Sequence, residues 1–297
     1  MSKSILPEII DAAQNRRSFI KKIGIATAAV GALSVVEAKP AEAQTANEMD
    51  ILNFALNLEY LEAEFYTYGE FGYGIEQFNI GTSGVASSSN PTTGGSTTGG
   101  KKVTFSNNLV FSSAILHQIG SDERAHVVLL RTFLGAKAIA KPNINLNALG
   151  LGFGNQSEYL TLARIFEDIG VSAYAGAAGL LTTPLVITTA ARILAAEAEH
   201  VSTIRTQIAR LNIPTPTLDG ADLVPPPTGP QTQYLSINTS NGLPAIRTAG
   251  QVLFLAFGNA ANATRGGFFP TGVNGVINTS TTAATAANLA TIPPTAG

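Results

Sequence analysis

Two glutamate–histidine pairs stand out in a chain that has only three histidines. Glu123 precedes His126 by three residues, and Glu197 precedes His200 by the same step. On an α-helix this spacing places both side chains of a pair on one face, about one turn apart. Metal sites inside four-helix bundles take such a pair from each of two helices and one further glutamate from each of the other two. The pairs therefore predict a metal centre, provided that two more glutamates occupy the right places.

Those glutamates are present in the required order. Glu59 lies ahead of the first pair and Glu167 lies between the pairs. Glu62 follows Glu59 by three residues, shares its helix face, and is the alternative ligand at that position. Tyr66 and Tyr174 follow Glu59 and Glu167 by seven residues each, close to two helical turns. Each tyrosine therefore shares the face of its glutamate and is a candidate for hydrogen bonds beside the site, although both can equally be ordinary core tyrosines.

Other ionisable residues near the motifs are expected to take no part. His117 lies nine residues before His126, about half a turn round the helix, and reads as a surface or packing histidine. The same geometry points three acidic residues away from the site: Glu64, Asp168 and Glu199.

The order Glu, Glu-x-x-His, Glu, Glu-x-x-His resembles the ferritin-like superfamily of di-iron and di-manganese carboxylate proteins. The motif residues span positions 59 to 200, and the full set is far more specific than one Glu-x-x-His step. Carboxylate and imidazole ligands without thiolate suit iron or manganese. The resemblance implies two such ions, with Glu123 and Glu197 bridging them. It implies further that Glu59 and His126 complete one site, and Glu167 and His200 the other.

Four long helices must position these residues, so the expected fold is an all-α, ferritin-like four-helix bundle with a long crossover. The bundle should occupy residues 44–212. Apolar periodicity, caps and breakers predict two equivalent helical hairpins, one on each side of the crossover. The expected helices cover residues 49–68, 107–134, 156–181 and 184–211.

Two further segments do not fit a simple bundle. Between positions 79 and 102, 16 of 24 residues are Gly, Ser or Thr, which predicts a flexible, exposed insertion in the first hairpin. The remainder, 213–297, is a proline-rich extension with one short apolar helix expected within 245–257. Its Gly266-Gly267-Phe268-Phe269-Pro270 run resembles the terminal region of exported, desiccation-related ferritin-like proteins.

The first 43 residues look like a targeting signal. Arg16-Arg17 precedes an apolar run of about 14 residues and the small-residue site Ala41-Glu42-Ala43, a pattern that resembles a twin-arginine signal peptide. The alternative is a membrane anchor, but a spanning helix needs about 20 apolar residues. The expectation is export to the periplasm or the extracellular space, with no stable membrane insertion after cleavage.

The composition of the chain limits the kinds of binding partner and chemistry that can be expected. Only 13% of residues are charged and the formal net charge is −2, with no basic patch beyond the first 22 residues, so no nucleic-acid partner is expected. The absence of cysteine excludes disulfides, zinc–thiolate sites and thiol nucleophiles. A homodimer is compatible with the pattern.

Two functions fit these observations. The first is a dinuclear iron or manganese oxidoreductase that acts on a small oxidant, peroxide or oxygen, with ferroxidase-, peroxidase- or catalase-like chemistry in oxidative or desiccation stress. The second is a non-enzymatic stress or cell-surface scaffold that uses the bundle as a frame. Bound metal with peroxide turnover would separate the first from the second.

Overall fold

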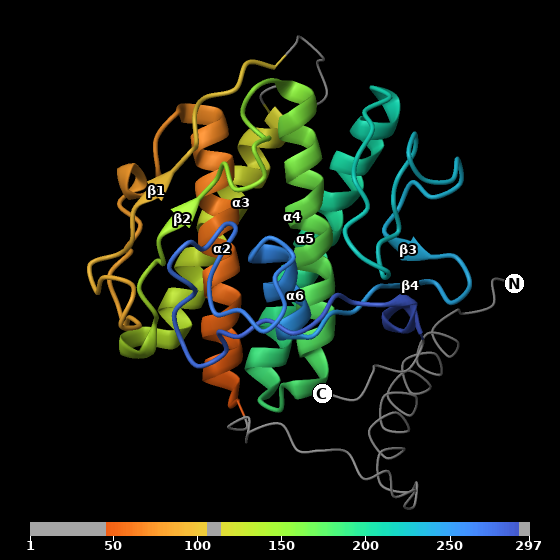
Figure 1. The fold of residues 1–297 in the computed structure, drawn as a ribbon. Coiled ribbons are helices and arrows are strands. Elements are labelled where there is room, and N and C mark those ends of the chain that lie inside the picture. The colour runs from red at the N-terminus through yellow and green to blue at the C-terminus, as the bar shows by residue number, and fades with distance from the viewer. Residues whose placement is uncertain (1–45, 106–113, 291–297) are drawn as a thin grey trace, which may run out of the picture. The chain divides into compact units, whose positions relative to one another are not determined.

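The computed structural model describes residues 46–105 and 114–290. The expected signal peptide, 1–43, lies outside the described residues. Four long helices form the body: α2 (Glu48–Phe71), α3 (Ala114–Leu134), α4 (Gln156–Ala177) and α5 (Pro184–Arg210). The chain is therefore all-α in its main architecture, as the sequence predicts, and α2 packs chiefly on α3 as α4 does on α5 (Figure 1).

Local sequence explains where the helices begin and end. The Asn47 side chain accepts hydrogen bonds from the backbone of Met49 and Asp50, and the Asp50 carboxylate accepts one from the Asn47 backbone, a capping box at the start of α2. The Asn155 side chain caps α4 by accepting a hydrogen bond from the Glu158 backbone N–H. Helix α5 has proline in its first turn, where the missing N–H costs nothing. Helix α4 ends earlier than expected and continues as a 3₁₀ turn, Ala178–Leu180.

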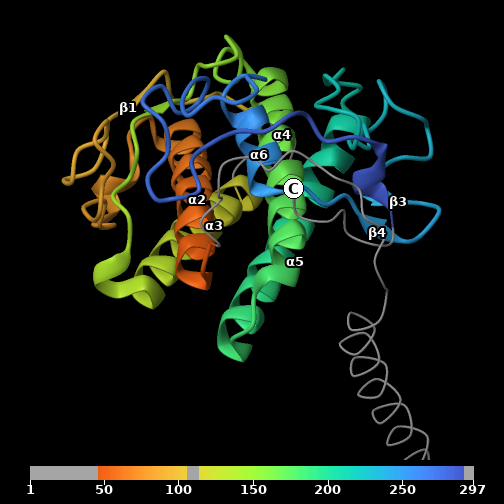
Figure 2. The same ribbon diagram turned by 60° about the horizontal axis from the view of Figure 1, so that its bottom comes forward.

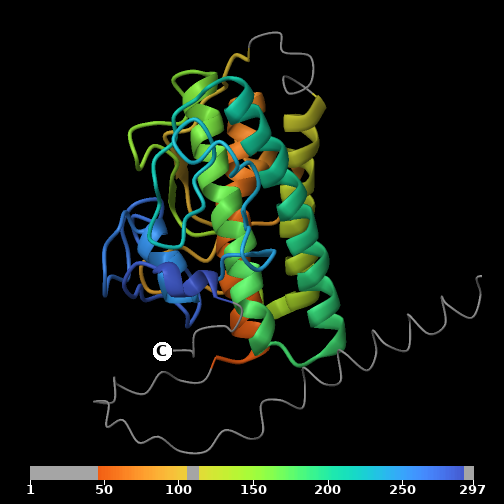
Figure 3. The same cartoon turned by 90° about the vertical axis from the view of Figure 1, so that its right-hand side faces the viewer.

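The four long helices differ in how much of their surface is buried. In α2 every residue from Ile51 to Thr67 is buried, and in α4 every residue from Tyr159 to Tyr174. Helices α3 and α5 each bury the side chains of only one face. The reason is visible in Figure 3, where α2 and α4 form a middle layer between α3 and α5 on one side and the C-terminal extension on the other. Ionisable residues within these buried stretches of α2 and α4 are thus shielded from water on both sides.

Segment 79–102 is largely exposed, as its composition predicts, yet it also docks on the link between α3 and α4. Strand β1 (Thr97–Thr98) pairs in parallel with β2 (Ile144–Asn145), and Val85 bridges to Ile139. The cause is backbone packing, because the glycines let the chain approach closely: a Cβ on Gly84 or Gly95 would collide with the backbone of the link between α3 and α4. A composition poor in large apolar side chains therefore did not prevent docking.

A buried ion pair fixes the same segment. Lys141 is 1% exposed and pairs with the buried carboxylate of Glu64, which also accepts a hydrogen bond from the Thr97 hydroxyl at 2.9 Å. Glu64 points away from the predicted metal site, as expected, and its ion-pair partner is Lys141. Removing one member of such a pair would leave an uncompensated buried charge.

The C-terminal extension adds one helix, α6 (Ala249–Ala256), and a second two-stranded ribbon, β3 (Ile237–Asn238) with β4 (Leu243–Pro244). Helix α6 begins four residues later than the expected segment because Thr248 and Gln251 form its capping box. It lies across α2 and α4 (Figures 1 and 2) and makes its main helix contacts with α4. The extension thus covers the bundle face that α3 and α5 leave open.

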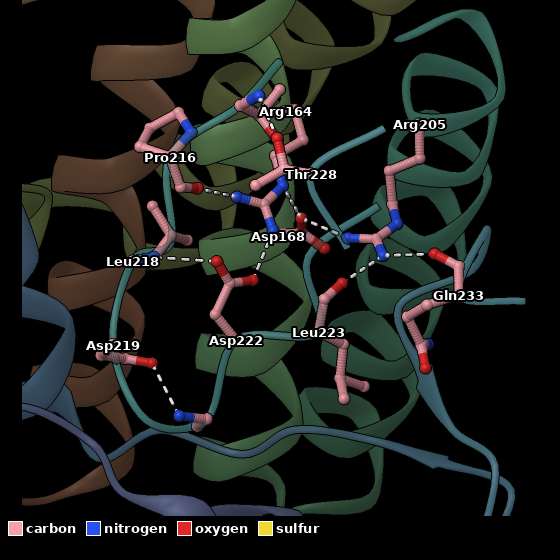
Figure 4. A network of polar contacts seen from close by, with 12 residues as sticks. Arg164, Asp168, Arg205, Pro216, Leu218, Asp219, Asp222, Leu223, Thr228 and Gln233 are labelled. Carbon is pink, nitrogen blue, oxygen red and sulfur yellow. Dashed lines mark hydrogen bonds and ion pairs between the residues drawn. The ribbon is translucent and has the colours of Figure 1, made fainter. Parts of the chain in front are cut away.

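Two buried arginines hold the extension to the bundle (Figure 4). Arg164 on α4 pairs with Asp168 and Asp222 and donates to the Pro216 carbonyl at 3.1 Å. Arg205 on α5 donates to the same Asp168 at 2.7 Å. Asp168 was expected to point away from the metal site, and it does so because it serves this network.

No helix in the described ranges has both the length and the apolar character needed to cross a membrane.

Candidate metal centre

Six of the predicted ligands come together in the middle of the bundle. They form two overlapping groups whose ligand atoms lie within 4.8 Å of one another. Glu123 and Glu197 belong to both groups, the arrangement that bridging carboxylates require. All six side chains are buried, and the four glutamates are 0% exposed. The members are Glu59, Glu123, His126 and Glu197 in one group, and Glu123, Glu167, Glu197 and His200 in the other.

Each histidine presents its Nδ1 atom to the carboxylates. His126 Nδ1 lies 3.2 Å from both Glu59 Oε2 and Glu123 Oε2, and 3.6 Å from Glu197 Oε1. His200 Nδ1 lies 2.9 Å from Glu123 Oε1 and, on its other side, 3.3 Å from a Glu167 oxygen. The i to i+3 step on each helix produces this geometry, as the sequence predicts.

The two predicted tyrosines lie beside the cluster, and they hydrogen-bond across it. Tyr66 on α2 donates to Glu167 on α4 at 2.5 Å, and Tyr174 on α4 donates to Glu59 on α2. Each tyrosine therefore holds the glutamate of the opposite helix, which leaves the second carboxylate oxygen free to face the centre. Burial raises the pKa of both phenols well above their usual value, so they remain hydrogen-bond donors at neutral pH.

Asp122 is a contributor that the sequence did not single out. Its Oδ2 lies 3.3 Å from His200 Nε2, on the far side of the ring from the carboxylate cluster. A carboxylate at this position holds the proton on Nε2 and leaves Nδ1 as the ligand atom. Nothing in the spacing marks this role, because Asp122 meets His200 only through the packing of α3 against α5.

The remaining candidates lie outside the two ligand groups. Glu62 is buried and near the site, but the two ligand groups contain Glu59 instead. His117 is exposed and lies 2.7 Å from Glu70. Glu199 is exposed on the outer side of α5. These positions agree with the expected geometry for His117 and Glu199, and they favour Glu59 over its alternative.

Burial and crowding shift the ionisation of the cluster. Burial raises the pKa of Glu59 to about 7, against the opposing pull of His126. Burial and then the neighbouring carboxylates raise the pKa of Glu197 well above its usual range. Burial acts on Glu123 too, but His126 and His200 outweigh it and hold its pKa below the usual range. The carboxylates likewise outweigh burial at His126 and raise its pKa to about 12.

The donor set allows metal binding. Among the described residues, nine buried side-chain N or O atoms lack a well-directed hydrogen bond, and five of the nine belong to this cluster. They include both oxygens of Glu197 and the Nδ1 atom of His200. Buried polar atoms without partners are costly unless a ligand satisfies them. The centre can therefore bind metal through atoms that the protein itself leaves unpaired.

A model of the ferritin-like domain matches residues 47–210, more than half of the chain. The protein therefore belongs to the ferritin-like family, and the matched range contains all six candidate ligands. The chain is also similar to the desiccation-related protein PCC13-62 of Craterostigma plantagineum, with 26% identity over 176 residues. That match covers 54% of this chain and 52% of the relative, so the chain spans about half the relative's length.

Proposed function

We propose that this protein is an exported ferritin-like oxidoreductase whose two iron or manganese ions consume peroxide or oxygen under oxidative or desiccation stress. The single observation that carries the proposal is the pair of buried ligand groups that share Glu123 and Glu197. Two bound ions of this kind supply reversible one-electron steps at adjacent positions, which is the chemistry that a two-electron oxidant needs.

The residues of the chain provide what such a centre requires. Glu59, Glu123, Glu167 and Glu197 offer four negative charges, which two divalent cations neutralise. Tyr66 and Tyr174 are the candidates for the catalytic surroundings, because each phenol can hold a carboxylate in place and supply a proton next to the centre. The complete burial of the glutamates excludes bulk water and strengthens these electrostatic interactions.

Metal loading tests this proposal directly. We expect wild-type protein purified from its native host to contain about two iron or manganese ions per chain by elemental analysis, and to consume hydrogen peroxide catalytically. Chelation should abolish turnover and lower the melting temperature, because ligands that bind only the folded state stabilise it. Protein that takes up neither metal under loading conditions would overturn the enzyme assignment.

A second candidate, a non-enzymatic stress scaffold, is favoured by one observation, the similarity to a protein named for desiccation. Under this alternative the bundle would be equally stable before and after chelation and would not turn over peroxide. The same experiment therefore decides between the two candidates.

Export is a separate part of the proposal and rests on Arg16-Arg17, the apolar run and Ala41-Glu42-Ala43. We expect the mature protein to begin near Gln44 and to be found outside the cytoplasm. Intact-mass measurement on protein from the native host checks this expectation, with an Arg16→Lys, Arg17→Lys variant as the control that should stay uncleaved inside the cell. A full-length wild-type product would contradict export.

A further inference from the structure

An apolar cavity of about 280 Å³ lies on the opposite side of α2 and α4 from helices α3 and α5. Its walls come from helices α2, α4 and α6, with Leu58, Ile165 and Val252 among them, and from the loops before α4, after α5 and after α6. The loops contribute Leu151, Thr217 and Asn259, among others. Helix α6 belongs to the C-terminal extension and closes the space between α2 and α4 (Figures 1 and 2). The extension thus builds a cavity that the four-helix bundle alone does not possess.

Glu62 is the one ionisable side chain among the residues that line this cavity. It is 5% exposed, and its carboxyl group forms no hydrogen bond with any described part of the protein. A largely buried carboxyl group that no described residue hydrogen-bonds gains from a partner inside the cavity. The position is the expected one for a side chain that hydrogen-bonds a molecule inside the cavity.

Gly170 lies beside both the cavity and the candidate metal ligands. It lines the cavity, and a Cβ built on it would lie 2.5 Å from Glu197 Oε2 and 3.3 Å from Glu62 Oε1. Any side chain larger than hydrogen would therefore push against both carboxyl groups. A molecule that reaches Glu62 consequently lies next to a shared carboxylate of the candidate metal centre.

We propose that this cavity binds a small, largely apolar organic molecule that carries one hydroxyl group, with the hydroxyl hydrogen-bonded to Glu62. Most of the lining is apolar, with Thr217 and Asn259 as its neutral polar side chains, and no lysine, arginine or histidine lines the cavity to neutralise an anionic ligand. A hydroxyl group can donate to a carboxylate or accept from a carboxylic acid, so it suits Glu62 in either state. An engineered cavity of 150 Å³ binds benzene, so this larger cavity has room for a substituted phenol or a medium-chain alcohol.

This binding site goes beyond the proposed metal chemistry, since its walls and Glu62 are protein groups that need no metal. Should the metal centre also prove active, the occupant would be placed as an organic substrate beside Glu197. A binding measurement on metal-free protein therefore tests the cavity alone. Its result remains valid even if the oxidoreductase proposal fails.

The test compares p-cresol with toluene, which differ by the hydroxyl group. Using isothermal titration calorimetry on the full chain, before and after chelation, we expect one p-cresol per protein and about tenfold tighter binding than toluene, the value of one net hydrogen bond. Glu62→Leu should remove this preference, whereas Glu62→Gln should keep most of it. Glu70→Leu, on the same helix but beside His117, is the matched control and should change nothing.

Methyl NMR on the wild type keeps the proposal testable even where a variant does not fold. We expect p-cresol to shift the methyl resonances of Ile165, Ile169 and Val252, and to leave those of Val127 and Ile204 on the other side of the bundle unchanged. Three outcomes would overturn the proposal: no saturable binding, equal affinity for the two ligands, or shifts outside the cavity. Tighter binding of benzylamine than of p-cresol would overturn the choice of a hydroxyl ligand.

Discussion

Replacing Glu197 with alanine should remove both metal ions and reduce peroxide turnover by more than about 100-fold. Glu197 belongs to both ligand groups, so its loss takes one ligand from each ion. Loss of a residue that only supports a ligand already costs ~10- to 100-fold in metal affinity or activity, and a shared ligand should cost more. Elemental analysis and peroxide assays on protein loaded under identical conditions measure the effect.

The chain offers a matched control two residues away. Glu199→Ala makes the same chemical change on the same helix at an exposed position, and it should leave metal content and turnover at the wild-type level. His117→Ala is a second control, since this histidine pairs with Glu70 outside the cluster. If Glu197→Ala retained two ions and full turnover, the assignment of Glu197 as a bridge would be wrong.

The Glu197→Ala variant also distinguishes a metal-binding role of Glu197 from a purely structural one. Neither oxygen of Glu197 has a well-directed hydrogen bond in the described structure, so the empty protein carries the cost of burying an unpartnered carboxyl group. Metal-free Glu197→Ala should therefore be at least as stable to denaturant as metal-free wild type. It should fail to gain stability when iron or manganese is added, whereas the wild type should gain it.

The candidate ligands could be selected from the sequence because the geometry that groups them is mostly local. The spacing of Glu123 and His126 places both on one helix face whatever surrounds the helix, and the same holds for Glu197 and His200. The order of the motifs along the chain then defines two hairpins. Tyr66 and Tyr174 show the limit of this reasoning, since spacing identified their helix face but not that each would bond to the opposite helix.

Features that depend on tertiary contacts could not be predicted. The contact of Asp122 with His200 arises only when α3 meets α5, and the proposed role of Glu62 depends on a cavity that α6 helps to line. Segment 79–102 is largely exposed, as its composition predicts, but composition gave no sign that the segment docks by close backbone approach at Gly84 and Gly95. The extension is held by buried polar residues, among them Arg164 and Asn274, whose partners lie far away in the sequence.

The metal-free protein should become less stable as the pH rises from about 5 to 8, and metal should reverse this trend. Glu59 has a pKa of about 7 in the folded state against a usual value of 4.5, so the folded state binds more protons over that interval. The free energy of unfolding then falls as the pH rises, because the unfolded state, with the lower pKa, binds fewer protons and is favoured at higher pH. At 1.36 kcal/mol per pKa unit, Glu59 alone accounts for up to about 3 kcal/mol.

The other groups of the cluster strengthen this trend or leave it unchanged. The pKa of His126 is raised from 6.5 to about 12, so its contribution to stability is complete below about pH 6.5 and is lost as the pH rises further. The pKa values of Glu62 and Glu197 are raised by burial and by neighbouring carboxylates, and both act in the same direction as Glu59. Glu123, with a lowered pKa, is ionised in both states above pH 5 and adds no slope there.

Urea unfolding of chelated and metal-loaded protein between pH 5 and 8 measures both halves of this prediction. Metal ions compete with protons for the same oxygens and nitrogens, so the stabilisation that they provide should grow with pH while the metal-free protein weakens. Glu62→Gln should reduce the pH dependence of the metal-free protein by removing one titrating carboxyl group, and the exposed Glu199→Gln should not. A metal-free protein whose unfolding free energy rises across this interval would show that the buried carboxyl groups are ionised and paired. The cluster would then be a structural ion-pair network that does not depend on metal.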